Sequence, residues 1–186
     1  MPRQRHFVNV VQPGETGFFT TTALDWAPVF SRTEMAQSMV QLLFEVHNFH
    51  GSQLHGFVVM PDHVHFISKL SSKISGAEFL NRFKSYTGTQ LRPRLNDRES
   101  KALATRAGLN RRVFWERGYR SFVIETEEVF AQKLIYIHEN PGRRGLCKRD
   151  IDYKWSSAAT FQAGYYNDAR GLGLSDWLAV TFGGGM

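Results

Sequence analysis

The sequence has little cysteine and no long apolar run. Cys147 is the only cysteine among 186 residues, so the chain forms no internal disulfide and fits a reducing compartment. No apolar stretch approaches the ~20 residues that a membrane-spanning helix needs. The basic start, MPRQRH, lacks the apolar segment of a signal peptide. We therefore expect a soluble, cytoplasmic protein with no membrane partner.

Internal repeats and low-complexity blocks are also absent, so nothing indicates a repeat array or a long linker. The length suits one domain, and 42% hydrophobic residues suffice for a core. Residues 1–16 contain prolines and few periodic apolar positions, which predicts an irregular basic arm. We expect one domain at residues 17–162 and a C-terminal tail at 163–186.

Acidic residues are in the minority. The 23 Lys and Arg against 17 Asp and Glu give a net charge of +6 and a pI near 9.7. A basic domain of this kind is typical of a polyanionic partner such as nucleic acid, although ordinary solubility charge has the same appearance. Residues 92–112 carry seven Arg or Lys against two acids. We predict a basic connection there, with a short helix at residues 99–107.

The rest of the sequence alternates strand-like and helix-like segments. The strand-like segments are rich in aromatic and β-branched residues, and the helix-like ones repeat apolar residues every three or four positions. Ser31 and Ser75 each precede a glutamate by three residues, which is the capping-box pattern. Pro141 is expected to end the last helix. The predicted strands are 17–24, 54–60, 63–69 and 120–125, and the predicted helices are 31–47, 75–92 and 126–140.

The resulting order, β-α-β-β-α-β-α, predicts an α+β fold of ferredoxin-like type. Four antiparallel strands would form the sheet, with helices packed on one face and an extra C-terminal helix. The short turn at Met60-Pro61-Asp62 joins the second and third strands as a hairpin. In this topology the third strand is central.

Two histidines begin that third strand. His63 and His65 are separated by Val64, and residues i and i+2 of a strand point to the same face. Val64 and Phe66 would then point into the core behind them. Neutral imidazole is a common ligand for divalent metals. By itself, however, a His-apolar-His pattern is more often structural than functional.

Two polar residues share one face of the last predicted helix. Tyr136 and Asn140 lie four residues apart, and the amide oxygen of asparagine is an acceptable ligand for Mg²⁺ or Mn²⁺. A phenol is a weak nucleophile at neutral pH but becomes useful where a metal polarises a phosphodiester. Each residue also has a plain interpretation, as a half-buried aromatic and as a helix terminus. His55 and His138 are interpreted as packing residues.

A set of motifs resembles a known family. The segment LHGFVVMPDHVHFI is followed after about seventy residues by YIHENPGRRGL and then by YKWSS, with FWERGYRSFVI between them. This pattern resembles the single-tyrosine HUH transposases, and most of all their REP-associated, IS200-like branch, over residues 17–162. The resemblance implies that His63, His65 and Asn140 bind Mg²⁺ or Mn²⁺ and that Tyr136 is the nucleophile.

The resemblance also implies a function. Enzymes of this family cleave single-stranded DNA at or beside a hairpin through a 5′-phosphotyrosine intermediate and rejoin strands without ATP. A bacterial, nucleoid-associated protein, monomeric or homodimeric, would be expected. One departure is the Gly142-Arg143-Arg144 segment, where relatives often carry a small apolar residue and Arg-Ala.

Basic and aromatic side chains near these motifs are candidates for DNA contacts. Basic groups position the DNA backbone, and aromatic rings stack on unpaired bases. For the aromatic candidates, packing in the core is the competing interpretation. The predicted DNA-binding residues are Lys84, Arg111, Arg112, Trp115, Arg143, Arg144, Lys148 and Arg149.

Two other functions compete with a transposase. Histidine-triad nucleotide hydrolases also carry alternating histidines, but the third position is Ile67 here. A non-catalytic, single-stranded nucleic-acid-binding module is the second alternative, because ferredoxin-like sheets commonly bind single strands. The complete set of His63, His65, Tyr136 and Asn140 favours the enzyme.

Overall fold

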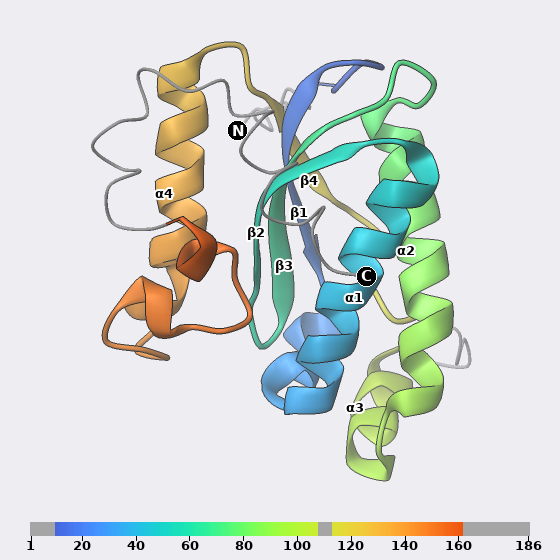
Figure 1. The fold of residues 1–186 in the computed structure, drawn as a ribbon. Coiled ribbons are helices and arrows are strands. Elements are labelled where there is room, and N and C mark those ends of the chain that lie inside the picture. Colours follow the sequence, from blue (N-terminus) through green and yellow to red (C-terminus); the bar gives the residue numbers. More distant parts are fainter. Residues whose placement is uncertain (1–9, 108–112, 162–186) are drawn as a thin grey trace, which may run out of the picture.

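Four antiparallel strands form the centre of the fold (Figure 1). The structure, a computed structural model, describes residues 10–107 and 113–161. Its sheet has the order β2-β3-β1-β4, so β3 is central, as predicted. The strands are β1 (Thr16–Thr22), β2 (Gln53–Val59), β3 (His63–Lys69) and β4 (Arg120–Val123).

The two faces of the sheet carry different helices. Val64 and Phe66 of β3 point into the main core, beneath α1 (Thr33–His50) and α2 (Gly76–Leu91). Ile67 points to the opposite face, where it packs in a second apolar cluster that includes Leu134 of α4. Helix α4 (Glu127–Arg143) therefore covers the other face of the sheet (Figure 1). The predicted ferredoxin-like fold with an extra helix is confirmed.

Local hydrogen bonds set where two of the helices begin. Ser75 caps α2 as predicted, because its Oγ accepts the Glu78 N–H. The predicted cap at Ser31 is wrong: residues Val29–Ser31 form a 3-10 turn, and α1 begins after Arg32. Helix α3 (Asp97–Ala107) begins earlier than predicted, because Asn96 Oδ1 accepts the Glu99 N–H at 2.9 Å.

Pro141 does not end α4, and that prediction is wrong. The helix continues to Arg143 with the proline in its last turn. A proline there removes a single backbone donor, and the following bonds still form. The Arg144 N–H donates to the Asn140 carbonyl, and the Leu146 N–H donates to the Pro141 carbonyl at 2.9 Å. Gly145, at a φ of 70°, then turns the chain out of the helix.

Part of the predicted N-terminal arm packs with the domain. Val11 is 1% exposed and belongs to the main core. Its carbonyl accepts the Gly76 N–H at 2.8 Å, and a Cβ on Gly76 would lie 2.9 Å from the Val11 Cβ. Residues 1–9 and the predicted tail, 163–186, lie outside the described residues. No helix in the described part of the chain is long and apolar enough to cross a membrane.

Candidate active site

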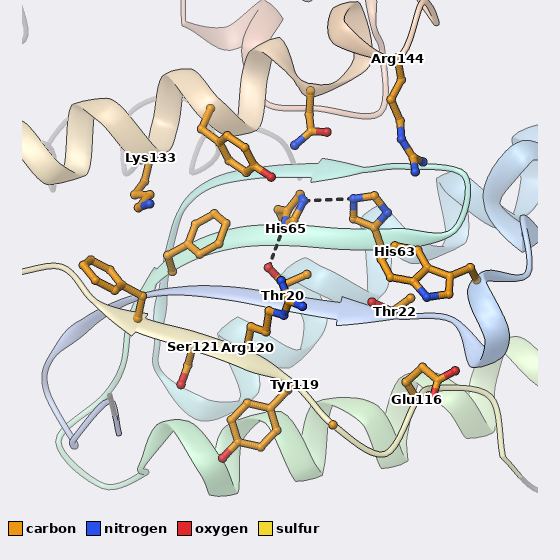
Figure 2. Close-up of a pocket in the computed structure, with 16 residues that line it drawn as sticks. Thr20, Thr22, His63, His65, Glu116, Tyr119, Arg120, Ser121, Lys133 and Arg144 are labelled. Atoms are coloured by element: carbon orange, nitrogen blue, oxygen red, sulfur yellow. Dashed lines mark hydrogen bonds between the residues drawn. The ribbon is translucent and has the colours of Figure 1, made fainter. Parts of the chain in front are cut away.

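His63 and His65 face each other on β3, on the side of the sheet that α4 covers (Figure 2). Their Nε2 atoms are 3.0 Å apart. His65 Nδ1 lies 2.8 Å from Thr20 Oγ1, because β1 pairs Thr20 directly with His65. His63 Nδ1 lies 2.5 Å from Asp62 Oδ1. Each imidazole thus has a neighbouring oxygen at its Nδ1, and the two Nε2 atoms point toward each other.

Burial keeps both imidazoles neutral. The pKa of His65 is lowered to about 3, mainly by burial and in smaller part by the neighbouring His63 and Arg144. Burial also lowers the pKa of His63, against the opposing effect of the Asp62 carboxylate. A neutral His63 whose Nδ1–H donates to Asp62 leaves the lone pair of its Nε2 free. The Thr20 hydroxyl can donate or accept, so it can serve either tautomer of His65.

Arg144 closes this arrangement from the end of α4. Its Nη1 donates to both oxygens of Asp62, at 2.9 and 3.0 Å. The chain of contacts therefore runs from α4 through Arg144 and Asp62 to His63. Asp62 is the last residue of the β2–β3 turn, and its backbone carbonyl also accepts the Ala23 N–H. Arg144, which we predicted to contact DNA, thus binds Asp62, the hydrogen-bond partner of His63.

Tyr136 and Asn140 project from α4 toward the histidine pair. The Tyr136 ring, 38% exposed, meets the His65 ring edge-on with centroids 5.6 Å apart. The Asn140 Nδ2 is buried and has no hydrogen-bond partner within the part of the chain that the structure describes. These residues and both histidines line one cavity of about 850 Å³. The structure thus brings the four predicted site residues together, while their roles stay predictions.

The geometry of these groups fits a divalent ion. Two neighbouring ligands of an octahedral ion, with bonds of ~2.1 Å, lie ~3.0 Å apart, which matches the separation of the histidine Nε2 atoms. The amide oxygen of Asn140 could serve as a third ligand, since rotation about the last side-chain bond exchanges its oxygen and nitrogen. Imidazole donors favour a transition metal such as Mn²⁺ over Mg²⁺. Among the described residues no group of three or more His, Cys, Asp or Glu side chains is placed to hold a metal.

Basic and aromatic side chains form much of the remaining cavity wall. Phe18 of β1 pairs with Phe122 of β4, and the Lys133 ammonium lies 5.7 and 5.2 Å from their ring centroids. Arg120 and Trp26 also line the cavity. None of these residues was predicted from the sequence to belong to the site. Three consecutive threonines, Thr20 to Thr22, end the first strand, but no local pattern in the sequence showed that this strand lies beside the histidines.

Two of the predicted DNA contacts, Trp115 and Lys84, are engaged with other parts of the domain. Trp115 is 4% exposed, and its indole N–H donates to Thr87 Oγ1 at 2.9 Å, so its ring packs in the core. The Lys84 ammonium donates to the carbonyls of Glu116 and Gly118, at 2.7 and 2.5 Å. Burial lowers its pKa to about 8. Lys84 thus supports a segment that lines the cavity but is not itself part of the lining.

The remaining predicted DNA contacts surround the end of α4. Arg143 pairs with Glu139 at 2.6 Å, and Arg149 pairs with Asp152 at 2.5 Å. Both are exposed pairs of the kind that contributes little to stability. Lys148 is exposed as well. Arg111 and Arg112 lie outside the described residues.

The other two histidines that the sequence singled out are buried, as predicted. His138 is fully buried, and its Nε2 lies 2.8 Å from Ser157 Oγ. His55 is 5% exposed and packs edge-on against Phe130. Neither lines the cavity.

Known proteins share this fold and these motifs. A sequence model of the family described as "Transposase IS200 like" matches residues 26–140, more than half of the chain. A search of curated proteins finds no match. One similar solved structure is that of a REP-associated tyrosine transposase bound to a REP hairpin. It is 19% identical with a TM-score of 0.61, and the match covers 93% of this chain and 92% of that one.

A second similar structure comes from Deinococcus radiodurans R1 and is assigned as a transposase. It is 18% identical with a TM-score of 0.51, and the match covers 75% of this chain and 97% of that one. At such low sequence identities, the two structures are evidence for the fold alone. The family match and the shared fold together confirm the resemblance that the sequence motifs indicated.

Proposed function

This chain belongs to the IS200-like transposase family, and from that premise we propose that it cleaves and rejoins single-stranded DNA at or beside a hairpin. The observation that carries the proposal is the convergence of Tyr136, His63, His65 and Asn140 on one cavity. The DNA named for the similar REP-associated transposase suggests a hairpin as the partner. The basic wall of the cavity suits a phosphate backbone.

Tyr136 would act as the nucleophile. Its phenolic oxygen would form a bond to phosphorus, and the bond between phosphorus and the 3′-oxygen would break. The phenol would lose its proton, and the departing 3′-oxygen would gain one. A phosphodiester is consumed and a phosphodiester is formed, so the same residue can return the strand to another 3′-hydroxyl without ATP.

His63, His65 and Asn140 would hold a divalent cation, Mn²⁺ or Mg²⁺, in this proposal. Such an ion neutralises charge on a non-bridging phosphate oxygen. Asp62 and Thr20 would fix the orientation of the two imidazoles from behind, a role that outer hydrogen-bond partners of metal ligands commonly have. The neutral state of both histidines at pH 7 suits this use.

The nucleophile would act within its own chain. Tyr136 and His65 of one chain already lie with their ring centroids 5.6 Å apart. The sequence had left a monomer and a homodimer equally open. A single chain holds the full set of groups, so a monomer would suffice for cleavage in this proposal.

Basic residues on two sides of the cavity would contact the DNA backbone. Arg120 and Lys133 line it directly, and Arg143, Lys148 and Arg149 surround the end of α4. Arg111 and Arg112 stay in the proposal on sequence grounds. Trp115 is left out because its ring is buried.

A covalent adduct tests the proposal. A pool of hairpin oligonucleotides with randomised single-stranded flanks is incubated with the protein and Mn²⁺, then separated on a denaturing gel. The expected adduct carries a label from the DNA 3′-end and not one from the 5′-end. Tyr136→Phe should abolish it and leave DNA binding intact.

Tyr86→Phe is the matched control, because Tyr86 is an exposed tyrosine of α2, on the other face of the sheet. It should form the adduct at the wild-type rate. An adduct that survives Tyr136→Phe would overturn the nucleophile. Binding without any adduct would favour the alternative function, a non-catalytic single-stranded nucleic-acid-binding protein.

A further inference from the structure

An exposed tryptophan stands at the edge of the cavity. The Trp26 side chain lines the cavity and is 57% exposed, which is unusual for so large an apolar group. Its ring meets the His63 ring edge-on, with centroids 5.8 Å apart. An exposed indole beside a site for DNA offers a flat surface on which an unpaired base can stack.

The backbone holds this tryptophan in a rare conformation. Asp25 and Trp26 have φ values of 56° and 58°, in the left-handed region that residues other than glycine seldom adopt. The segment is held by hydrogen bonds. The Asp25 N–H donates to Glu116 Oε1 at 2.6 Å, and the Trp26 N–H donates to the Ala23 carbonyl at 2.9 Å. Such strained residues cluster at functional sites, where the surrounding structure maintains them.

Trp26 and Tyr136 lie at opposite ends of the histidine pair. Tyr136 packs against His65 and Phe18, with centroids 5.6 and 6.0 Å apart. Trp26 packs against His63. The contacts therefore run in the order Tyr136, His65, His63, Trp26, with the nucleophile first and the exposed indole last.

This order has a consequence for the DNA. In an in-line displacement at phosphorus the attacking and leaving oxygens lie on opposite sides. If Tyr136 attacks from the His65 end, the departing 3′-oxygen and its nucleotide lie toward the His63 end. We propose that Trp26 stacks on the base of this departing nucleotide, so that the base 5′ of the cleaved bond must be unpaired. The proposal rests on the proposed function of Tyr136.

The aromatic pair at the other end is a poorer candidate for this base. Phe18 and Phe122 lie on the Tyr136 side, and the Lys133 ammonium is placed over both rings. Trp26 has the larger ring and the greater exposure. The departing base is therefore assigned to Trp26 alone.

Trp26→Gly separates stacking from folding, because glycine suits a φ of 58°. The experiment uses the Tyr136→Phe chain, which binds without cutting, and DNA whose cleaved bond has been mapped from the adduct of the wild-type chain. Single abasic sites are placed at each nucleotide beside that bond. In the Tyr136→Phe chain, loss of the departing base should weaken binding by about tenfold or more.

Adding Trp26→Gly should weaken the binding of intact DNA by a similar factor. In that double variant, DNA with the departing base removed should bind as tightly as intact DNA. Trp26→Phe should restore part of the loss. Phe49→Ala removes another exposed aromatic ring, on α1, and should leave both affinities unchanged. Thermal unfolding confirms that each variant is folded, and Trp26→Asn provides a second replacement that tolerates the left-handed conformation.

Two results would overturn the stacking. One is an unchanged abasic profile in both the Gly and the Asn variants. The other is a coupling to the nucleotide on the 3′ side of the cleaved bond. Both can occur while the Tyr136 adduct still forms, so they leave the proposed function standing. Failure of the adduct itself would instead overturn the proposed function.

Discussion

Arg144 donates from one nitrogen to both carboxylate oxygens of Asp62, at 2.9 and 3.0 Å, although the two residues lie far apart in sequence. Asp62 in turn contacts Nδ1 of His63 at 2.5 Å. The end of α4, which carries Tyr136 and Asn140, is thereby tied to the turn that precedes the histidine pair. Arg144 and Asp62 thus connect α4 to β3, although neither residue is a predicted metal ligand or the predicted nucleophile.

Arg144→Gln should therefore weaken metal binding. Without the guanidinium, Asp62 is free to turn away from His63, and loss of such an outer partner typically costs about 10–100-fold in metal affinity. The Mn²⁺ concentration that gives half-maximal adduct formation should rise by about tenfold. Arg82→Gln, which removes an exposed i,i+4 pair with Glu78 on α2, should leave it unchanged. An unchanged midpoint in Arg144→Gln would reduce the Arg144–Asp62 contact to a surface ion pair.

Asn140→Leu should separate stability from function. The Asn140 Nδ2 is buried without a partner among the described residues, and a buried polar atom of that kind costs about 1–3 kcal/mol. A leucine of similar size removes this cost, so the free energy of unfolding should rise by about 1 kcal/mol. Adduct formation should fall sharply, because the amide oxygen is lost. Chemical denaturation and the gel assay measure the two effects, and a loss of stability without a loss of adduct would contradict the assignment.

The buried histidines should make the fold less stable in acid. Burial lowers the pKa of His47 to about 4, against the ordinary value of 6.5. Because the unfolded chain takes up the proton first, the stabilisation is complete above pH 6.5 and is lost as the pH falls toward 4. The shift corresponds to about 3 kcal/mol.

His47→Gln should flatten the dependence of the unfolding free energy on pH within this window. His50→Gln is the control. His50 lies on the same helix but is far less buried than His47, and its pKa is lowered less. Part of the slope should remain, because His55 and His138 also have pKa values lowered by burial, to about 4 and about 3. Urea titrations at a series of pH values measure the slope. An equal slope in His47→Gln and wild type would show that protonation of His47 does not cause the loss of stability in acid.

Mixing two inactive variants tests whether the tyrosine acts in its own chain. His65→Ala keeps the nucleophile and lacks a ligand, whereas Tyr136→Phe keeps the ligands and lacks the nucleophile. If each site is built from one chain, as the 5.6 Å separation of the two rings indicates, the mixture should form no adduct. Adduct in the mixture would show that the tyrosine is supplied by a partner chain.

The sequence predicted the sheet and the histidine pair because both rest on local patterns. Alternation of two residues placed His63 and His65 on one face, and the order of strands and helices placed β3 at the centre. The sequence also indicated that Tyr136 and Asn140 share a helix face, since their spacing is four. The family resemblance then joined these two half-sites.

Other features depend on contacts that no local pattern contains. Arg144 was predicted to contact DNA, and its engagement with Asp62 follows only from the packing of α4 on the sheet. Trp115 was predicted to contact DNA, but the neighbouring Phe114 already indicated the core in which the structure places it. Pro141 was expected to end α4, yet one missing donor in a last turn is tolerated. The left-handed conformation of Asp25 and Trp26 is held by two hydrogen bonds, from the Asp25 N–H to Glu116, which is far away in sequence, and from the Trp26 N–H to Ala23.

In the proposed reaction, Tyr136 joins the DNA through its phenolic oxygen. Mass spectrometry of the adduct, after digestion with a protease and a nuclease, locates this bond. We expect a single peptide with a 5′-phosphonucleotide on Tyr136, formed only when Mn²⁺ or Mg²⁺ is present. A nucleotide on any other residue, or cleaved DNA with no linked peptide, would contradict it.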